Sequence, residues 1–134
     1  MAKFSVQKYG GSLFMPDGRG YEEVAEHIIS EKEKGKFVIA PVSAAYKLTD
    51  RLRGDYKRVL DGYSIKAIKE ELRRDYPIFD LSDNTSTVLD LMEKILEIDE
   101  GDNLVGVKYE TMGERLTCII LADIIKRKGH DAVY

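Results

Sequence analysis

Residues 37–42 read Phe-Val-Ile-Ala-Pro-Val, six apolar residues with no polar residue between them. A half-buried strand would alternate apolar and polar side chains, whereas a strand without alternation is usually covered on both faces, as in a parallel sheet. Because proline has no N–H to donate to a neighbouring strand, we expect the strand to end near Pro41. The run therefore predicts a buried strand of a parallel sheet.

The sequence before this run supplies the other two parts of a strand–helix–strand unit. Residues 21–34 carry apolar side chains at helical spacing, with Glu22 and Glu23 in the first turn and Gly35 directly after the last. An acidic first turn suits the helix dipole, and glycine commonly ends a helix. Residues 4–9, with apolar or aromatic side chains before a glycine pair, predict a strand. Together they form a βαβ unit and predict an α/β fold.

The rest of the chain is predicted to be mainly helical, from apolar stripes at helical spacing. Helices are predicted over residues 48–60, 65–72, 88–96 and 111–128. Tyr76-Pro77 should stop the second of these helices, and residues 101–103 (Gly-Asp-Asn) indicate a loop. Residues 131–134 are similar to the start of another strand. Since a buried parallel strand needs neighbours and helices on both sides, we expect the chain to be part of a larger domain.

Composition and charge exclude several classes of protein. Hydrophobic residues make up 43% of the 134 residues and charged residues 34%, which is typical of a globular protein rather than a disordered one. A net charge of −3 without a basic cluster does not favour nucleic acid. The apolar runs are far shorter than the ~20 residues of a membrane span, and the first residues lack the apolar core of a signal peptide.

The few cysteine and histidine residues argue against a disulfide or a structural metal. Cys118 is the single cysteine, which fits a reducing cytoplasm, and it lies in an apolar helical pattern where we expect it to be buried. His27 and His130 have no Cys or His partner at ligand spacing. The expectation is a cytoplasmic protein without a structural metal.

Residues 8–12, Lys-Tyr-Gly-Gly-Ser, follow the first predicted strand. In open α/β sheets, ligands bind beyond the carboxyl ends of the strands. Paired glycines let the backbone approach an anion, whose oxygens can accept from backbone N–H groups, and Lys8 adds a positive charge. A glycine pair after a strand is more often only a turn, so this pattern alone leaves both interpretations open.

Two further segments have both a structural and a functional interpretation. Ser43 follows the second predicted strand, and Thr49 opens the next helix. In the structural interpretation, Thr49 is simply the N-cap of that helix. Thr111 and Glu114 have the spacing of a capping box, with the glutamate reaching back to the threonine N–H. The same carboxylate could instead pair with the ammonium group of a ligand.

In this order and spacing, the three segments resemble those of the aspartate kinases of the amino acid kinase superfamily. The resemblance covers essentially all of residues 1–134 and corresponds to the N-terminal, acceptor-binding portion of the catalytic domain. It implies a three-layer α/β fold in which helices flank parallel strands. It also implies the family's reaction, in which ATP with Mg²⁺ phosphorylates the side-chain carboxylate of L-aspartate in the biosynthesis of lysine, threonine and methionine.

The resemblance implies roles for seven residues. They are Lys8 as the catalytic residue, Gly10, Gly11 and Ser12 as phosphate-binding residues, and Ser43, Thr49 and Glu114 as substrate-binding residues. In the family, the residue that matches Glu114 binds the α-amino group of aspartate. Thr117 stands where the family usually has serine.

The sequence departs from the family pattern in two places. Leu13 and Phe14 follow the glycine turn, where the family has Ser-Val, so a hydroxyl role there is lost. Tyr46 and Lys47 stand where it has small residues and glycine. A bulky ring and a charge would narrow the pocket or add a contact, which affects the expected choice of substrate.

The nucleotide-binding portion, a catalytic aspartate in a Gly-Gly-Ser-Asp segment and the regulatory domains have no match in the chain. We therefore expect no kinase activity from it alone, no tightly bound cofactor and at most weak binding of L-aspartate. The expected partners are the missing C-terminal kinase portion and a second copy, through the helical residues 54–110. The alternatives are a kinase for another acceptor, which the second and third segments disfavour, and a diverged non-catalytic domain that binds a small ligand or another chain.

Overall fold

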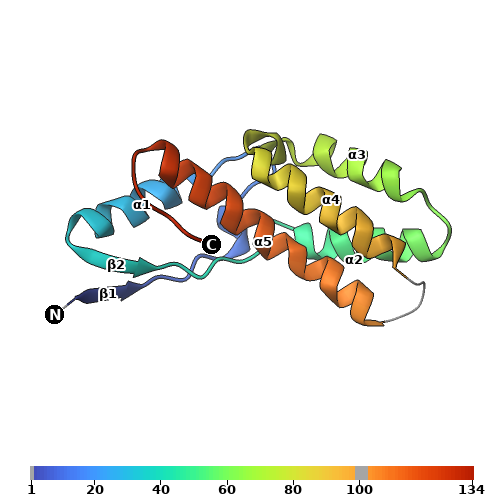
Figure 1. The fold of residues 1–134 in the computed structure, drawn as a ribbon, viewed down its shortest axis with the longest axis horizontal. Coiled ribbons are helices and arrows are strands. Elements are labelled where there is room, and N and C mark those ends of the chain that lie inside the picture. The colour runs from blue at the N-terminus through green and yellow to red at the C-terminus, as the bar shows by residue number, and fades with distance from the viewer. Residues whose placement is uncertain (1, 99–102) are drawn as a thin grey trace.

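The computed structural model describes residues 2–98 and 103–134 and shows a mixed α/β structure of elongated shape (Figure 1). Its elements are β1 (Lys3–Val6), the 3-10 turn η1 (Gly11–Leu13), α1 (Tyr21–Glu33), β2 (Lys36–Ile39), α2 (Leu48–Leu60), α3 (Ile65–Asp75), the 3-10 turn η2 (Pro77–Leu81), α4 (Asp83–Glu97) and α5 (Asn103–Arg127). None of the described helices is long and apolar enough to cross a membrane.

The strands β1 and β2 are parallel, and their pairing continues beyond the regular ladder. Tyr9 pairs with Val42, its N–H donates to the carbonyl of Pro41 (2.9 Å), and its carbonyl accepts from the N–H of Ser43 (3.1 Å). The equivalent bond to the carbonyl of Gln7 would have to come from Pro41, which has no N–H. Both predicted strands are confirmed, and the regular ladder breaks near Pro41 for the predicted reason.

Among the described residues, helices cover one face of this sheet and leave the other open. Figure 1 shows α1 along one side of the two strands. Phe4 and Phe37 pair on the opposite face, where they are 66% and 62% exposed, beside the exposed pair Val6 and Ile39. The prediction of a strand buried on both faces is therefore wrong for the described residues, because α1 packs on one side only.

The helix α5 joins the sheet to the other helices. It packs against α1 at one end and against α2 and α4 along the rest of its length (Figure 1). The shared core is made of fully buried side chains from these helices, among them Leu48, Leu52, Leu89, Met92, Leu116 and Ile119. One continuous apolar core therefore holds the strands and the helices together.

Two of the predicted helix ends are confirmed. Helix α1 begins at Tyr21 and ends at Glu33, and Gly35 follows in the left-handed conformation (φ 77°). Helix α3 ends at Asp75, and Pro77 begins η2. The local signals were sufficient here because glycine and proline act on the backbone of their own residue and of their neighbours.

The predicted start of the last helix is wrong. Helix α5 begins at Asn103, so Thr111 lies within it and its hydroxyl donates to the carbonyl of Lys108 (2.9 Å). The capping box with Glu114 is therefore not formed. The helix extends this far back because Val105 and Tyr109 are buried in the core. Of the predicted loop at 101–103, the first two residues lie outside the described part of the chain.

Two further predictions near the C-terminus also differ from the structure. Residues 131–134 form no strand, because after Gly129 ends α5 they run on without pairing to β1 or β2. Cys118 is half-buried rather than buried. Burial and the carboxylate of Glu114 raise the pKa of its thiol.

Candidate ligand-binding site

An open pocket of about 210 Å³ lies at the carboxyl ends of the two strands. It is lined by Gly11, Ser12, Ala44, Ala45, Tyr46, Lys47, Leu48, Thr49 and Asp50. Pockets for drug-sized ligands have volumes of about 300–1,000 Å³, so this one suits a smaller molecule. Its position agrees with the general rule that ligands bind beyond the carboxyl ends of parallel strands.

One of the two predicted phosphate-binding glycines is required by packing. A Cβ atom on Gly11 would lie 2.3 Å from the carbonyl oxygen of Ala44 and 3.7 Å from the Cβ atom of Ser43. A Cβ atom on Gly10 would have no neighbour within 4 Å, and its φ of −77° suits any residue. Gly11 therefore lets the first loop contact the second, whereas Gly10 has no such role.

Gly113 makes a similar contact from the opposite direction. A Cβ atom there would lie 3.0 Å from the Cβ atom of Ala44 and 3.4 Å from Cδ2 of Leu48. Helix α5 thus packs closely on the loop at Gly113, where a Cβ atom would require Ala44 to shift by a few tenths of an ångström. The loop of residues 43–49 is held between Gly11 and Gly113, so the three segments found in the sequence meet at Ala44.

The second loop enters α2 through an unusual backbone conformation. Lys47 lies in the left-handed region (φ 58°, ψ 7°) and is the residue before the first turn of α2, which begins at Leu48. The interpretation of Thr49 as an N-cap is therefore wrong. Thr49 lies inside the first turn, half-buried, and lines the pocket. Glycine and asparagine adopt this conformation far more readily than lysine does.

The structure brings together part of the predicted site. Gly11, Ser12 and Thr49 line the pocket, and Ser43 lies beside Gly11. Gly10 is exposed and does not line the pocket; its carbonyl accepts from the N–H of Leu13 within η1.

The two charged residues of the predicted site do not line the pocket. Lys8 is exposed on the open face of the sheet, and Glu114 is exposed on α5, next to Gly113. Thr117 is fully buried, and its hydroxyl donates to the carbonyl of Gly113 (3.2 Å), so it points into the core.

Two charged side chains line the pocket. Asp50, which had been assigned no role, forms an ion pair with Arg53 (3.3 Å), and its side chain is 82% exposed. The Nζ atom of Lys47 lies 5.2 Å from the centre of the Tyr46 ring.

Within residues 2–98 and 103–134, no group of three or more His, Cys, Asp or Glu side chains could hold a metal ion.

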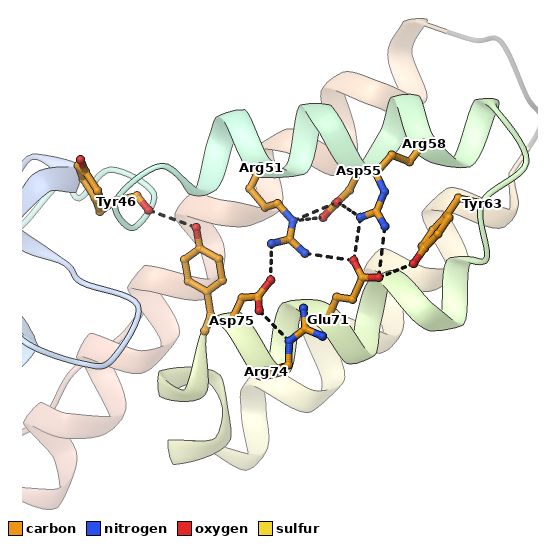
Figure 2. A network of polar contacts seen from close by, with 9 residues as sticks. Tyr46, Arg51, Asp55, Arg58, Tyr63, Glu71, Arg74 and Asp75 are labelled. Carbon is orange, nitrogen blue, oxygen red and sulfur yellow. Dashed lines mark hydrogen bonds and ion pairs between the residues drawn. The ribbon is translucent and has the colours of Figure 1, made fainter.

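A network of charged residues fixes α2 to α3 (Figure 2). Asp55, of which 1% is exposed, accepts from the guanidinium groups of Arg51 (2.9 Å) and Arg58 (3.1 Å). Arg58 also donates to Glu71 (2.8 Å), and Arg51 donates to Asp75 (2.6 Å). Asp55 is thus paired within α2, and its two arginine partners connect α2 to the carboxylates of α3.

A buried tyrosine next to this network contacts the pocket loop. The residue after Asp75, Tyr76, is buried, and its hydroxyl donates to the carbonyl of Tyr46 (3.2 Å), which lies on the pocket loop (Figure 2). From the other side, the N–H of Tyr46 donates to the carbonyl of Phe14 (2.8 Å). The backbone of Tyr46 is therefore fixed on both sides, and the conformation of the next residue, Lys47, depends on it.

No known protein-family model and no curated protein matches this chain.

Proposed function

We propose that the chain is the acceptor-binding part of an amino acid kinase of the aspartate kinase type, and that its pocket receives L-aspartate. The observation that carries the proposal is the meeting of three segments at Ala44, where Gly11 and Gly113 both contact the loop of residues 43–49. These segments are far apart in the sequence, and each was assigned to the site on a separate pattern. Two of the segments line the pocket, and the third contacts the lining residues Ala44 and Leu48, which supports a shared binding role.

The proposal assigns different roles to the pocket and to the charged groups near it. Ser43 and Thr49 hold the acceptor and Glu114 pairs with its α-amino group, while Gly11 and Ser12 bind the phosphoryl group. Lys8 acts on the phosphoryl group. In the intact enzyme ATP would supply that group and Mg²⁺ would neutralise its charge, and both would be bound mainly by the other portion of the kinase domain, so the chain alone does not catalyse transfer. The exposed apolar side chains on the open sheet face are consistent with contact to that portion.

Titration of ¹⁵N-labelled protein with L-aspartate tests the proposal. We expect weak binding, with a dissociation constant on the order of 1–10 mM, and shifts of the amide signals of Gly11, Ser12 and Thr49. Glu114→Gln should weaken binding about tenfold, because a hydrogen bond between charged groups contributes about 1.5–3 kcal/mol. The matched control is Glu97→Gln, an exposed glutamate on α4, which should bind like the wild type.

Two results would contradict this proposal. One is the absence of any shift in the pocket signals up to about 50 mM L-aspartate. The other is a measurable release of ADP by the chain alone that depends on both ATP and L-aspartate.

A non-catalytic ligand-binding domain is the second candidate, and Tyr46 and Lys47 favour it because both line the pocket. Fusion of the chain to the nucleotide-binding portion of an aspartate kinase separates the two candidates. A kinase should gain ADP release that depends on L-aspartate and is lost in Lys8→Met. A non-catalytic domain should bind its ligand in the fusion without releasing ADP.

A further inference from the structure

Lys47 combines an unfavourable backbone conformation with a position at the pocket. Among the described residues, Lys47 is the one non-glycine residue with positive φ. A lysine is disfavoured there because its Cβ atom crowds the backbone, which glycine avoids. Such outliers persist when the surrounding structure imposes them, and they are frequent at functional sites.

The surrounding structure does impose this conformation. On one side, the backbone of Tyr46 is held by Phe14 and Tyr76. On the other, the N–H of Leu48 donates to the carbonyl of Ala45 (2.9 Å), and both residues are buried. Fixed neighbours explain how the chain keeps the conformation, but they do not explain why a lysine rather than a glycine occupies it.

In the described part of the chain, the charge of Lys47 has no anionic partner. Its Nζ atom contacts the ring of Tyr46, and none of the ion pairs among the described residues includes it. The other charge at the pocket, Asp50, is already paired with Arg53. Lys47 is exposed and lines the pocket, so its ammonium group can reach a molecule held there.

We propose that Lys47 is a ligand-binding residue whose ammonium group pairs with an anionic group, a carboxylate or a phosphoryl oxygen, of the molecule in the pocket. The inference rests on the proposed function only in taking the pocket as the binding site. It adds a contact from a side chain that stands where the resembling family has a small residue or glycine. Tyr46 supports the ammonium group from one side through its ring.

Titration of four proteins with two probes tests the inference. The proteins are the wild type, Lys47→Gln, Lys47→Gly and the control Lys57→Gln, and the probes are L-aspartate and inorganic phosphate. Lys57 is exposed on the same helix, about 15 Å further along it. The dissociation constants come from amide shifts, and each variant's thermal midpoint is measured in parallel.

We expect both Lys47 variants to bind the anion about tenfold more weakly than the wild type, and the control to bind it equally well. Lys47→Gly should also raise the thermal midpoint by roughly 3 °C, because it removes the strain of a left-handed backbone at a residue with a Cβ atom. Lys47→Gln should leave the midpoint nearly unchanged. A gain in stability combined with a loss of binding separates a functional lysine from a purely structural one.

The outcomes distinguish this inference from the proposed function. Equal binding of L-aspartate by the wild type and Lys47→Gln would overturn the role of Lys47 and leave the proposed function standing. Binding of phosphate but not of L-aspartate, weakened in Lys47→Gln, would support Lys47 and count against the proposed acceptor. A wild type that binds neither probe up to about 50 mM would overturn both.

Discussion

The sheet end of the molecule, formed by β1, β2 and α1, exposes apolar side chains, whereas the helical end, formed by α2, α3 and α4, buries charges. Phe4 and Phe37 are more than 60% exposed on the open face of the sheet. Asp55, at the helical end, is 1% exposed and is held by two arginines. The first arrangement leaves apolar side chains exposed, while the second pairs its buried carboxylate with two arginines.

This difference indicates where the molecule is built for stability and where for binding. A buried carboxylate is tolerated only with partners, and the network around Asp55 supplies them. Lys47 has an unfavourable conformation that its neighbours impose, and it takes part in none of the ion pairs among the described residues although it lies at the pocket. This unfavourable conformation therefore lies at the ends of the two strands, outside the charged network.

The largest expected effect comes from breaking the network at the helical end. Asp55→Ala should lower the free energy of unfolding by about 3 kcal/mol, because it leaves two guanidinium groups without their shared carboxylate. Urea denaturation measures the loss. The control is Asp90→Ala, which removes an exposed partner of Lys69 and should cost less than about 1 kcal/mol. Equal losses in the two variants would show that burial of the network contributes nothing.

A second prediction tests the close contact between the two loops at the sheet end. Gly11→Ala should lower the free energy of unfolding by about 2 kcal/mol, because its Cβ atom would lie 2.3 Å from the carbonyl oxygen of Ala44. It should also abolish the amide shifts that L-aspartate causes. Gly10→Ala, the neighbouring control, should change stability by less than about 0.5 kcal/mol. Similar losses of unfolding free energy in both variants would show that the contact between Gly11 and Ala44 is not the cause of the loss.

The smallest expected effect is a dependence of the thermal midpoint on pH. It involves one carboxylate from each end of the molecule, Glu71 and Glu31. Hydrogen bonds from Arg58 and Tyr63 lower the pKa of Glu71 to about 2, and those from Lys34 and Lys36 lower the pKa of Glu31 to about 2. A carboxyl group with a lowered pKa stabilises the folded state above its unfolded pKa. That contribution is lost as the pH falls through the folded value.

Thermal midpoints should therefore fall between about pH 4.5 and pH 2, the range between the ordinary and the lowered pKa of these groups. Glu31→Gln and Glu71→Gln should each make this fall shallower, and the double variant should make it shallower still. An unchanged pH profile in both single variants would show that these ion pairs contribute nothing to the stability of the folded state.

The βαβ unit and the helix ends at Glu33 and Asp75 were predictable from the sequence, because each depends on residues close together in the chain. The start of α5 was not. Thr111 and Glu114 have the local spacing of a helix start, but burial of Tyr109 extends the helix backward across that signal. Tertiary packing overrode a capping pattern whose contribution is about 1 kcal/mol.

For the candidate site, the sequence indicated the segments but not how they would meet. Ser12 and Thr49 were predicted and line the pocket, while Lys8 and Glu114 were predicted and do not. The reason for Gly113 was not visible in the sequence, because it depends on the distance to Ala44, 69 residues earlier in the chain. A close approach between distant segments has no local pattern.

The sequence by itself determined the strand–helix–strand order and the break at Pro41, because periodicity, proline and glycine act over short distances. A kinase site formed by the three segments stays a proposal. The tertiary structure decided which glycine needs to be a glycine, where α5 begins and which face of the sheet stays open. It also placed Lys47 in a conformation that lysine rarely adopts. These features depend on which surfaces of the folded chain contact each other. The sequence of a strand does not determine how many of its faces helices will cover.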